Sequence, residues 1–301
     1  MKIIRADHLG MCFGVRDAIA LALEKSTQEP VTILGDLVHN ETVLADLRAR
    51  GVQFARSPEN IGTASVMITA HGASEKAMKE VRLRGHTVME ATCPLVHFAH
   101  RSIAGLVREG YHPVIIGKRD HVEVRGMTGD LTDFDVVLTE SEVFELREHA
   151  RFGVAAQTTQ PIDRVRLLVA LLRRRFPGSE VRFIDTVCQP TKQRQNAAVE
   201  LAQRCDVVVV IGGAHSNNTQ ELVKTCSRHC ERVRHVQGPS DLQASWFSGA
   251  RTVGITAGTS TPDVLIDAVE KWLQANCVET TNAGLNKSPA PVQSDTRLKA
   301  A

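Results

Sequence analysis

The stretch Thr87-Val88-Met89-Glu90-Ala91-Thr92-Cys93-Pro94-Leu95-Val96 joins a short β-rich run to a cysteine and to the start of a helical pattern. The same order occurs twice more: Lys2 to Cys12 precedes one helical pattern, and Val181 to Cys188 precedes another. The cysteines are separated by roughly 80 to 95 residues, which is the length of a small α/β unit. This repetition predicts three related lobes, with one strand, cysteine and helix in sequence for each of them.

Three cysteines in equivalent places, Cys12, Cys93 and Cys188, indicate a shared site. A cysteine at a helix N-terminus lies beside unpaired N–H groups and the positive end of the helix dipole, which lower the thiol pKa and favour the thiolate. Three converging thiolates suit either a zinc ion with one further ligand or an iron–sulfur cluster with one iron left open. The alternative is three unrelated buried cysteines, each a small core residue, and the repeated context weakens it.

The composition is that of a folded chain without a polyelectrolyte partner. Its 301 residues, 43% of them hydrophobic, allow two domains or three small ones. A formal net charge of +2, a pI near 8.2 and 4% aromatic residues give no sign of a nucleic-acid surface. We therefore expect no nucleic-acid partner.

We also expect a cytoplasmic protein with no membrane partner. The longest apolar runs, such as Val207 to Ile211, are too short to span a bilayer, and the chain begins with a strand pattern rather than a secretory signal. An odd number of cysteines, seven, then favours reduced or metal-bound thiols over disulfides. Residues 278–301 have the polar composition of a flexible tail.

Short β-rich runs alternate with helical patterns along the rest of the chain. Including the three runs before the cysteines, about nine strands are predicted. The other six are Val31 to Leu34, Ser65 to Thr69, Pro113 to Ile116, Gly153 to Ala156, Val207 to Ile211 and Thr252 to Ile255. Strands that alternate with helices form parallel sheets, whose ligands bind at the carboxyl ends of the strands. The chemistry is therefore expected in the loops that follow the strands.

These loops carry imidazoles, hydroxyls, amides and one carboxylate. The candidates are His39, His71, His121, Glu123, Thr158, Ser216, Asn217, Asn218 and Ser260. Helix N-termini and small polar side chains bind phosphate, and histidine can donate a hydrogen bond or carry charge. The set predicts a small anionic ligand such as a diphosphate. For any single hydroxyl, a plain helix N-cap is the alternative.

Taken together, the motifs resemble the LytB/IspH family, the 4-hydroxy-3-methylbut-2-enyl diphosphate reductases. The resemblance covers about residues 1 to 275, with the motifs in the family's order. They are Gly10-Met11-Cys12-Phe13-Gly14-Val15, Val38-His39-Asn40, Ala70-His71-Gly72, Ala91-Thr92-Cys93-Pro94-Leu95-Val96, His121-Val122-Glu123-Val124, Gln157-Thr158-Thr159 and Thr256-Ala257-Gly258-Thr259-Ser260.

The resemblance implies an α/β fold of three similar small parallel-sheet lobes in a pseudo-threefold arrangement around a central 4Fe-4S cluster. It implies that Cys12, Cys93 and Cys188 hold the cluster and leave one iron open. We expect lobe 1 at 13–95, lobe 2 at 96–190, and lobe 3 at 191–277 plus 1–12.

The resemblance also implies the reaction and its residues. The substrate would be 4-hydroxy-3-methylbut-2-enyl diphosphate, reduced to isopentenyl and dimethylallyl diphosphate in the last step of the methylerythritol phosphate pathway. Glu123 would deliver a proton and Thr158 would orient the hydroxyl. The diphosphate would be bound by His39, His71, His121, Ser216, Asn218 and Ser260. A ferredoxin or flavodoxin would donate the electrons.

Asn217 departs from the family pattern, in which a second serine often stands at this place. An amide there replaces a hydroxyl, so the part that Asn217 takes in binding phosphate is open.

Other readings of the three cysteines predict different properties. Quinolinate synthase and diphthamide-type radical enzymes also gather three cysteines around a cluster but need not have these histidine loops. A non-catalytic iron–sulfur sensor or electron carrier would lack a diphosphate pocket. A zinc hydrolase would contain zinc and no sulfide.

Overall fold

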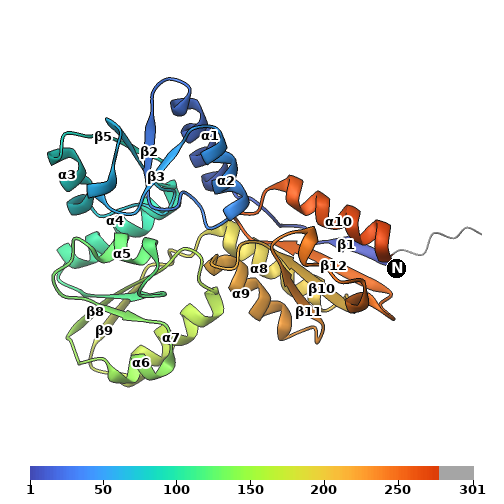
Figure 1. The fold of residues 1–301 in the computed structure, drawn as a ribbon. Helices are drawn as coiled ribbons and strands as arrows, with labels where there is room; N and C mark the ends of the chain where they lie inside the picture. Colours follow the sequence, from blue (N-terminus) through green and yellow to red (C-terminus); the bar gives the residue numbers. More distant parts are fainter. Residues whose placement is uncertain (278–301) are drawn as a thin grey trace, which may run out of the picture.

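The computed structural model describes residues 1–277 and forms three lobes, each built on a parallel four-stranded sheet (Figure 1). The predicted tail, 278–301, lies outside the described residues. The strand orders are β3-β2-β4-β5, β7-β6-β8-β9 and β11-β10-β12-β1. The three sheets thus share one topology, and the first strand of the chain completes the third sheet.

Lobe 1 begins after the first cysteine. Its strands are β2 (Val31–Leu34), β3 (Gln53–Ala55), β4 (Ser65–Ile68) and β5 (Thr87–Glu90). Its helices are α1 (Phe13–Ser26), α2 (Glu41–Ala49) and α3 (Glu75–Leu83). The apolar sides of α1 and α2 pack on β2 in one core, and β4 is buried along its whole length. A strand covered on both faces needs no alternation of polar residues, which explains the continuous apolar run.

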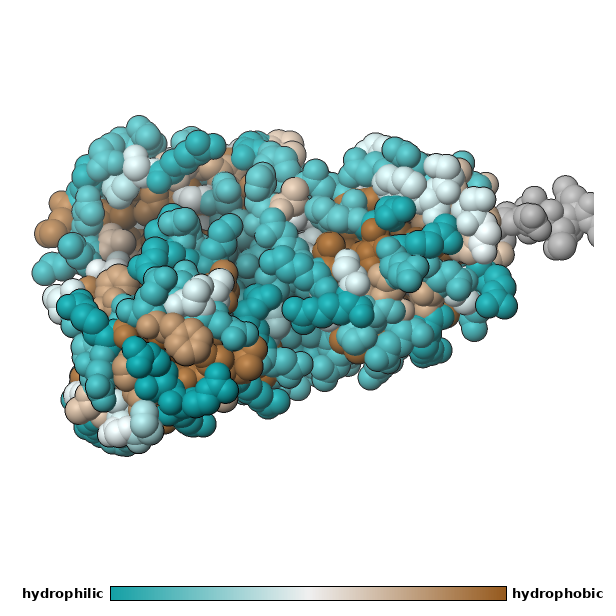
Figure 2. Space-filling model, turned by 90° about the horizontal axis from the view of Figure 1, so that it is seen from below, coloured by the Kyte–Doolittle hydropathy of each residue, from teal (hydrophilic) through white to brown (hydrophobic). Residues whose placement is uncertain are grey.

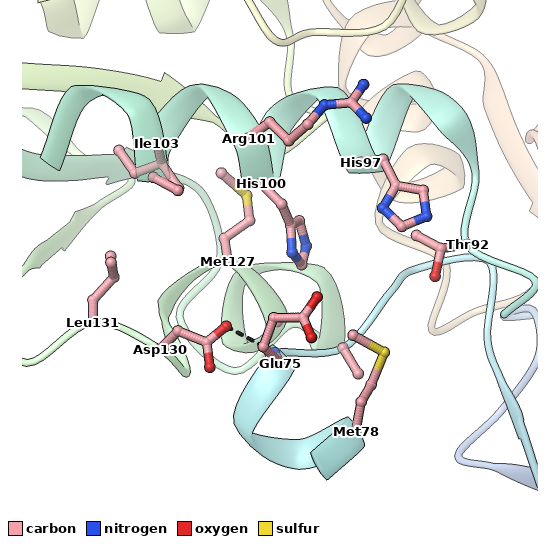
Figure 3. Close-up of a pocket in the computed structure, with 13 residues that line it drawn as sticks. Glu75, Met78, Thr92, His97, His100, Arg101, Ile103, Met127, Asp130 and Leu131 are labelled. Atoms are coloured by element: carbon pink, nitrogen blue, oxygen red, sulfur yellow. Dashed lines mark hydrogen bonds between the residues drawn. The ribbon is translucent and has the colours of Figure 1, made fainter. Parts of the chain in front are cut away.

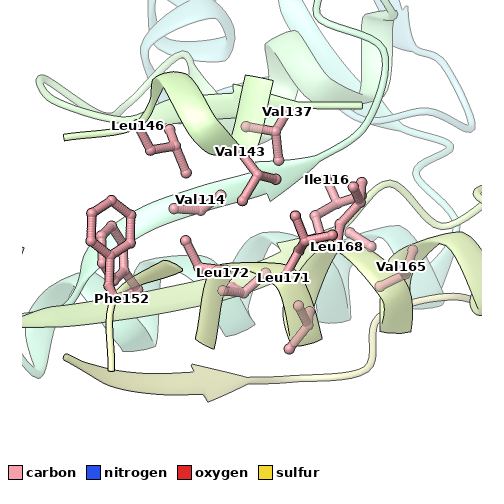
Figure 4. Packing of buried hydrophobic residues seen from close by; sticks show 14 of the residues in the cluster. Val114, Ile116, Val137, Val143, Leu146, Phe152, Val165, Leu168, Leu171 and Leu172 are labelled. Carbon is pink, nitrogen blue, oxygen red and sulfur yellow. The ribbon is translucent and has the colours of Figure 1, made fainter. Parts of the chain in front are cut away.

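Lobe 2 repeats this plan. Its strands are β6 (His112–Ile116), β7 (Asp135–Val137), β8 (Arg151–Ala156) and β9 (Glu180–Phe183). Its helices are α4 (Pro94–Arg108), α5 (Val122–Thr128), α6 (Glu140–Glu145) and α7 (Ile162–Arg175). Leucines of α7 pack against β6 and β8 from one side, as Figure 4 shows, and α4 covers the other side.

Lobe 3 joins the two ends of the described chain. Its strands are β1 (Lys2–Arg5), β10 (Val207–Ile211), β11 (Val233–Val236) and β12 (Thr252–Ala257). Its helices are α8 (Gln189–Ala202), α9 (Asn217–Ser227) and α10 (Asp263–Cys277). Helix α10 covers one face of the sheet, and α8 with α9 covers the other.

The chain passes from one lobe to the next at each predicted cysteine. Edge strand β1 belongs to lobe 3, but α1 after it packs on lobe 1. In the same way α4 follows β5 and packs on lobe 2, and α8 follows β9 and packs on lobe 3. The chain therefore changes lobe between β1 and α1, between β5 and α4, and between β9 and α8.

The prediction of about nine strands was too low for the described residues, which contain twelve. The three that it missed are β3, β7 and β11, and each forms one edge of its sheet. They are three or four residues long and partly exposed, so they lack the continuous apolar run by which the buried strands were recognised.

The surface drawn in Figure 2 is mostly hydrophilic, with hydrophobic residues in separate areas rather than in one continuous belt. Within residues 1–277, no helix has both the length and the apolar character needed to cross a membrane.

Candidate active site

The three predicted cysteines occupy the same structural position in the three lobe junctions. Cys12, Cys93 and Cys188 are the N-cap residues of α1, α4 and α8. None of the three side chains makes an N-cap hydrogen bond to its helix. The thiols are therefore not used for capping and are available to a ligand.

All three cysteines line one cavity of about 70 Å³ where the lobes meet. Two residues that the sequence reasoning did not select help to shape it. A Cβ added to Gly14 would lie 2.5 Å from Cys93 Sγ, so only glycine permits this close approach of α1. Thr191 Oγ1 lies 3.0 Å from Cys188 Sγ. Their spacings, Cys-x-Gly and Cys-x-x-Thr, are the only sequence signals for them.

The expectation that helix N-termini lower the thiol pKa values is wrong for two of the cysteines. Burial raises the pKa of Cys93, although backbone N–H groups of its helix act in the opposite direction. Burial raises the pKa of Cys188 to about 11, against the hydrogen bond with Thr191. Loss of hydration thus outweighs the helix dipole here, so both thiols are protonated at neutral pH, and a nearby cation would favour their thiolate forms.

Glu123 lies in the same cavity and is only 1% exposed. Its two carboxyl oxygens accept hydrogen bonds from Thr158, one from the backbone N–H at 2.6 Å and one from Oγ1 at 3.0 Å. Burial raises the pKa of Glu123 to about 7, and the hydrogen bonds from Thr158 offset only part of this effect. Near neutral pH this carboxyl can therefore hold or release a proton.

Three histidines, one after each of strands β2, β4 and β6, form a cluster beside the cysteines. The ring centroids are 4.5 Å apart for His39 and His71, 5.2 Å for His39 and His121, and 5.6 Å for His71 and His121. Burial lowers the pKa of all three, to about 3 for His121 and well below the ordinary value for His71. The cluster is therefore uncharged at neutral pH in the free protein.

The hydrogen bonds of these histidines are incomplete. The backbone N–H of Glu123 donates to His121 Nδ1, which leaves the proton of the neutral ring on Nε2. His39 Nε2 and His71 Nδ1 are buried and have no hydrogen-bond partner within residues 1–277. Buried polar atoms without partners are costly, so their placement around one cavity indicates a polar ligand.

Lobe 3 contributes hydroxyl and amide groups to the same place. A cavity of about 30 Å³ is lined by the three histidines together with Ser216, Asn217, Asn218 and Ser260. Asn218 Oδ1 accepts a hydrogen bond from Thr259 N, whereas Asn218 Nδ2 is buried and has no hydrogen-bond partner in the described part of the chain. Ser216 caps α9 by accepting from Thr219 N, so the N-cap alternative holds for this residue, although its own O–H can still donate.

Asn217 reaches across a lobe boundary. Its Nδ2 donates to Thr159 Oγ1 of lobe 2 at 3.1 Å. The amide lines the cavity but already has a protein partner, so Asn217 joins lobes 2 and 3 beside the ligand groups.

The cysteine cavity and the histidine cavity are adjacent and share lining residues. Val15, His71, Thr159 and Thr259 border both. All the site residues predicted from the sequence therefore lie around one space between the three lobes.

A separate cavity of about 190 Å³ lies between α3, α4 and α5 (Figure 3). In it the backbone N–H of Glu75 donates to Asp130 at 2.8 Å, and burial lowers the pKa of His100 to about 4. It is lined by none of the site residues predicted from the sequence. We therefore assign the chemistry to the central space.

Comparison with known proteins identifies the relatives of this chain. The family model described as LytB protein matches residues 3–274. A 4-hydroxy-3-methylbut-2-enyl diphosphate reductase of Geobacter sulfurreducens is 37% identical over 278 residues, covering 91% of this chain and 97% of that protein. The reductase of the same name from Trichlorobacter lovleyi is 36% identical over 271 residues, covering 89% of this chain and 96% of that protein.

Solved structures give the same result. The E-1-hydroxy-2-methyl-but-2-enyl-4-diphosphate reductase of Plasmodium falciparum superposes with a TM-score of 0.85 at 25% identity, over 91% of this chain and 88% of that one. A structure of (E)-4-hydroxy-3-methyl-but-2-enyl diphosphate reductase gives 0.66 at 36% identity, over 91% of this chain and all of that one. These matches confirm the three-lobed α/β fold and the assignment to an enzyme family of reductases. With a family model that spans residues 3–274 and relatives matched over almost their full length, the chain belongs to the LytB protein family.

Proposed function

We propose that this chain reduces the allylic alcohol of 4-hydroxy-3-methylbut-2-enyl diphosphate. Two electrons and two protons cleave the C–O bond, release the hydroxyl as water and leave isopentenyl or dimethylallyl diphosphate. The observation that carries the proposal is the convergence of three thiols, a buried carboxyl with a pKa of about 7 and three neutral imidazoles on one space. The reaction needs a reductant, an acid and an anion pocket, and each has a candidate there.

Cys12, Cys93 and Cys188 would hold one 4Fe-4S cluster with three protein ligands. The donor set fits this group, because three thiols from three lobes line one cavity and none of them caps a helix. When bound, such a cluster supplies electrons and an iron without a protein ligand, which can act as a Lewis acid. The close packing of Gly14 against Cys93 holds that sulfur in position.

The histidine cluster and the lobe 3 loops would bind the diphosphate. Neutral imidazole donates one N–H, and the unpartnered amide of Asn218 and the hydroxyls of Ser216 and Ser260 add further donors. A diphosphate oxygen beside an imidazole also favours the protonated ring, because the opposite charge stabilises it. Substrate binding would therefore take up protons. Asn217 would position Thr159 across the lobe boundary.

Glu123 would deliver a proton to the reacting end of the substrate. Its carboxyl lines the cysteine cavity, and because burial raises its pKa to about 7, it can hold a proton near neutral pH. Thr158 fixes the carboxyl through two hydrogen bonds, and both residues line the cysteine cavity. The same hydroxyl can turn to the substrate oxygen and orient it.

The electrons would come from a ferredoxin or flavodoxin, as the resemblance to the reductase family implies. The cytoplasmic location inferred from the sequence is part of the proposal, because reduced thiols and an oxygen-sensitive cluster suit a reducing compartment.

The test is anaerobic turnover of cluster-loaded protein with a reduced viologen dye. We expect dye oxidation that depends on 4-hydroxy-3-methylbut-2-enyl diphosphate, with isopentenyl and dimethylallyl diphosphates as products. A fully loaded protein that binds the substrate without oxidising the dye would indicate another cluster enzyme. A loaded protein that does not bind it would indicate a sensor, and zinc without sulfide would indicate a hydrolase.

A further inference from the structure

A second group of ligating side chains lies at the opposite end of the lobe 2 sheet. His112 and Asp135 are the first residues of β6 and β7, and His149 lies just before β8. One donor atom from each of these three residues lies within 4.8 Å of the other two. His121 and Thr158 follow the opposite, carboxyl ends of β6 and β8. A five-residue strand is about 15 Å long, so this length separates the two groups of side chains. The group is therefore separate from the central space.

The two imidazoles are held face to face. The rings of His112 and His149 have centroids 3.7 Å apart and planes 10° apart, and the edge of the pair packs against the buried Phe152. Two zinc-bound nitrogens are about 3.3 Å apart when each lies about 2.0 Å from the metal in tetrahedral geometry. Because the two planes are nearly parallel, the nitrogen lone pairs do not meet at one point as the rings stand. Binding one ion therefore requires the half-buried His149 ring to rotate about its side-chain torsions until its lone pair points to the ion held by His112.

Carboxylates flank both nitrogens of His112. Nε2 lies 2.8 Å from Asp135 Oδ2, and Nδ1 lies 3.7 Å from Asp133 Oδ2. A metal that replaces the proton shared by Nε2 and Asp135 would leave the ring proton on Nδ1, facing Asp133. A ligating histidine whose other N–H donates to a carboxylate is the usual arrangement in metal sites.

We propose that lobe 2 binds one divalent first-row transition metal ion through His112, Asp135 and His149, with Asp133 orienting the His112 ring. Two imidazoles and a carboxylate suit zinc and its neighbours rather than magnesium or calcium. The ion would tie the first residues of β6 and β7 to the loop before β8. Its effect would therefore be on the stability of lobe 2 and not on the chemistry at the central space.

The test is a titration of the cluster-loaded chain with zinc alone, followed by anomalous scattering on both sides of the zinc edge, which separates zinc from iron. His39, His71 and His121 also form a group that can bind a metal, so variants are compared with one another. We expect the wild-type chain and His229→Ala, an exposed histidine elsewhere, to bind one equivalent more than His149→Ala. Asp133→Asn should weaken that site about tenfold.

Two results would overturn the proposal. One is a His149→Ala chain that keeps the stoichiometry and affinity of the wild type. The other is an anomalous map without zinc between the two rings. His149→Ala could also have a lower unfolding temperature than the wild type in the presence of a chelator, and its loss of zinc binding would then reflect a damaged fold. In that case Asp133→Asn is the deciding variant, because the Asp133 side chain is 75% exposed. Unchanged zinc binding by that variant would then reject the site.

Discussion

Replacing Glu123 by glutamine should make the protein more stable and much less active. Glutamine keeps both contacts with Thr158, because its carbonyl accepts from the backbone N–H and its amide donates to Oγ1. It cannot deliver a proton, so turnover should fall by roughly 10²- to 10⁴-fold.

The gain in stability follows from the raised pKa. Below pH 4.5 the carboxyl is protonated in both the folded and the unfolded chain, so it brings no penalty. Between pH 4.5 and about 7 the unfolded chain ionises first, and the folded state loses stability as the pH rises. Over this window the wild type loses roughly 3 kcal/mol of its free energy of unfolding, since each tenfold change in proton affinity is worth about 1.4 kcal/mol. Glutamine does not ionise, so Glu123→Gln does not suffer this loss.

The assay is thermal unfolding of cluster-loaded wild type and Glu123→Gln from pH 5 to pH 8.5. The variant should gain roughly 5 to 10 °C relative to the wild type across this range, at about 2 to 4 °C per kcal/mol for a chain of this size. A difference that does not change with pH would refute the buried, proton-holding carboxyl.

Glu221 provides the matched control. It is 4% exposed, and although burial acts to raise its pKa, the ion pairs with Arg164 and Lys224 lower it. Its contribution to stability is present above the unfolded pKa and is lost only as the pH falls through the folded value. Glu221→Gln should therefore be less stable than the wild type by a constant amount above pH 6, and it should keep its turnover.

Three further predictions test the other parts of the site. Cys93→Ser should lose the cluster, measured as iron and acid-labile sulfide; contents equal to those of the wild type would remove Cys93 from the ligand set. His71→Ala should raise KM at least tenfold and reduce the protons taken up on substrate binding, measured by calorimetry in buffers of different ionisation enthalpy. Equal uptake would show that His71 stays neutral in the complex. Asn217→Ala should cost about 1 kcal/mol through the lost contact with Thr159 and should change KM more than kcat; a fall in kcat alone would contradict a positioning role.

The repeated strand, cysteine and helix predicted the fold because the pattern is carried by buried residues. A parallel strand covered on both faces, such as β10, is apolar throughout, so its position is visible in the sequence. Edge strands such as β7 are set by pairing with a neighbour, and short sequences such as Asp135–Val137 carry no such signal.

The sequence predicted which residues form the candidate site, but not their burial, their pKa values or their hydrogen-bond partners. Sequence position placed Cys93 and Cys188 at helix N-termini correctly, yet their pKa values depend on burial, which three lobes create together. For the same reason the sequence could not show that the amide of Asn217 is already bonded to Thr159, a residue 58 positions away.

Burial has opposite effects on the acid and the imidazoles, and these effects combine at the centre of the molecule. It lowers the pKa values of His39, His71 and His121 and raises that of Glu123, so each group tends toward its uncharged form. A diphosphate entering this space meets little carboxylate charge to repel it. Its own negative charge then favours protonation of the imidazoles and raises the pKa of Glu123 further, because a nearby anion disfavours a second one. Under the proposed mechanism, in which Glu123 delivers a proton, the bound substrate therefore helps to keep that proton in place until it is used.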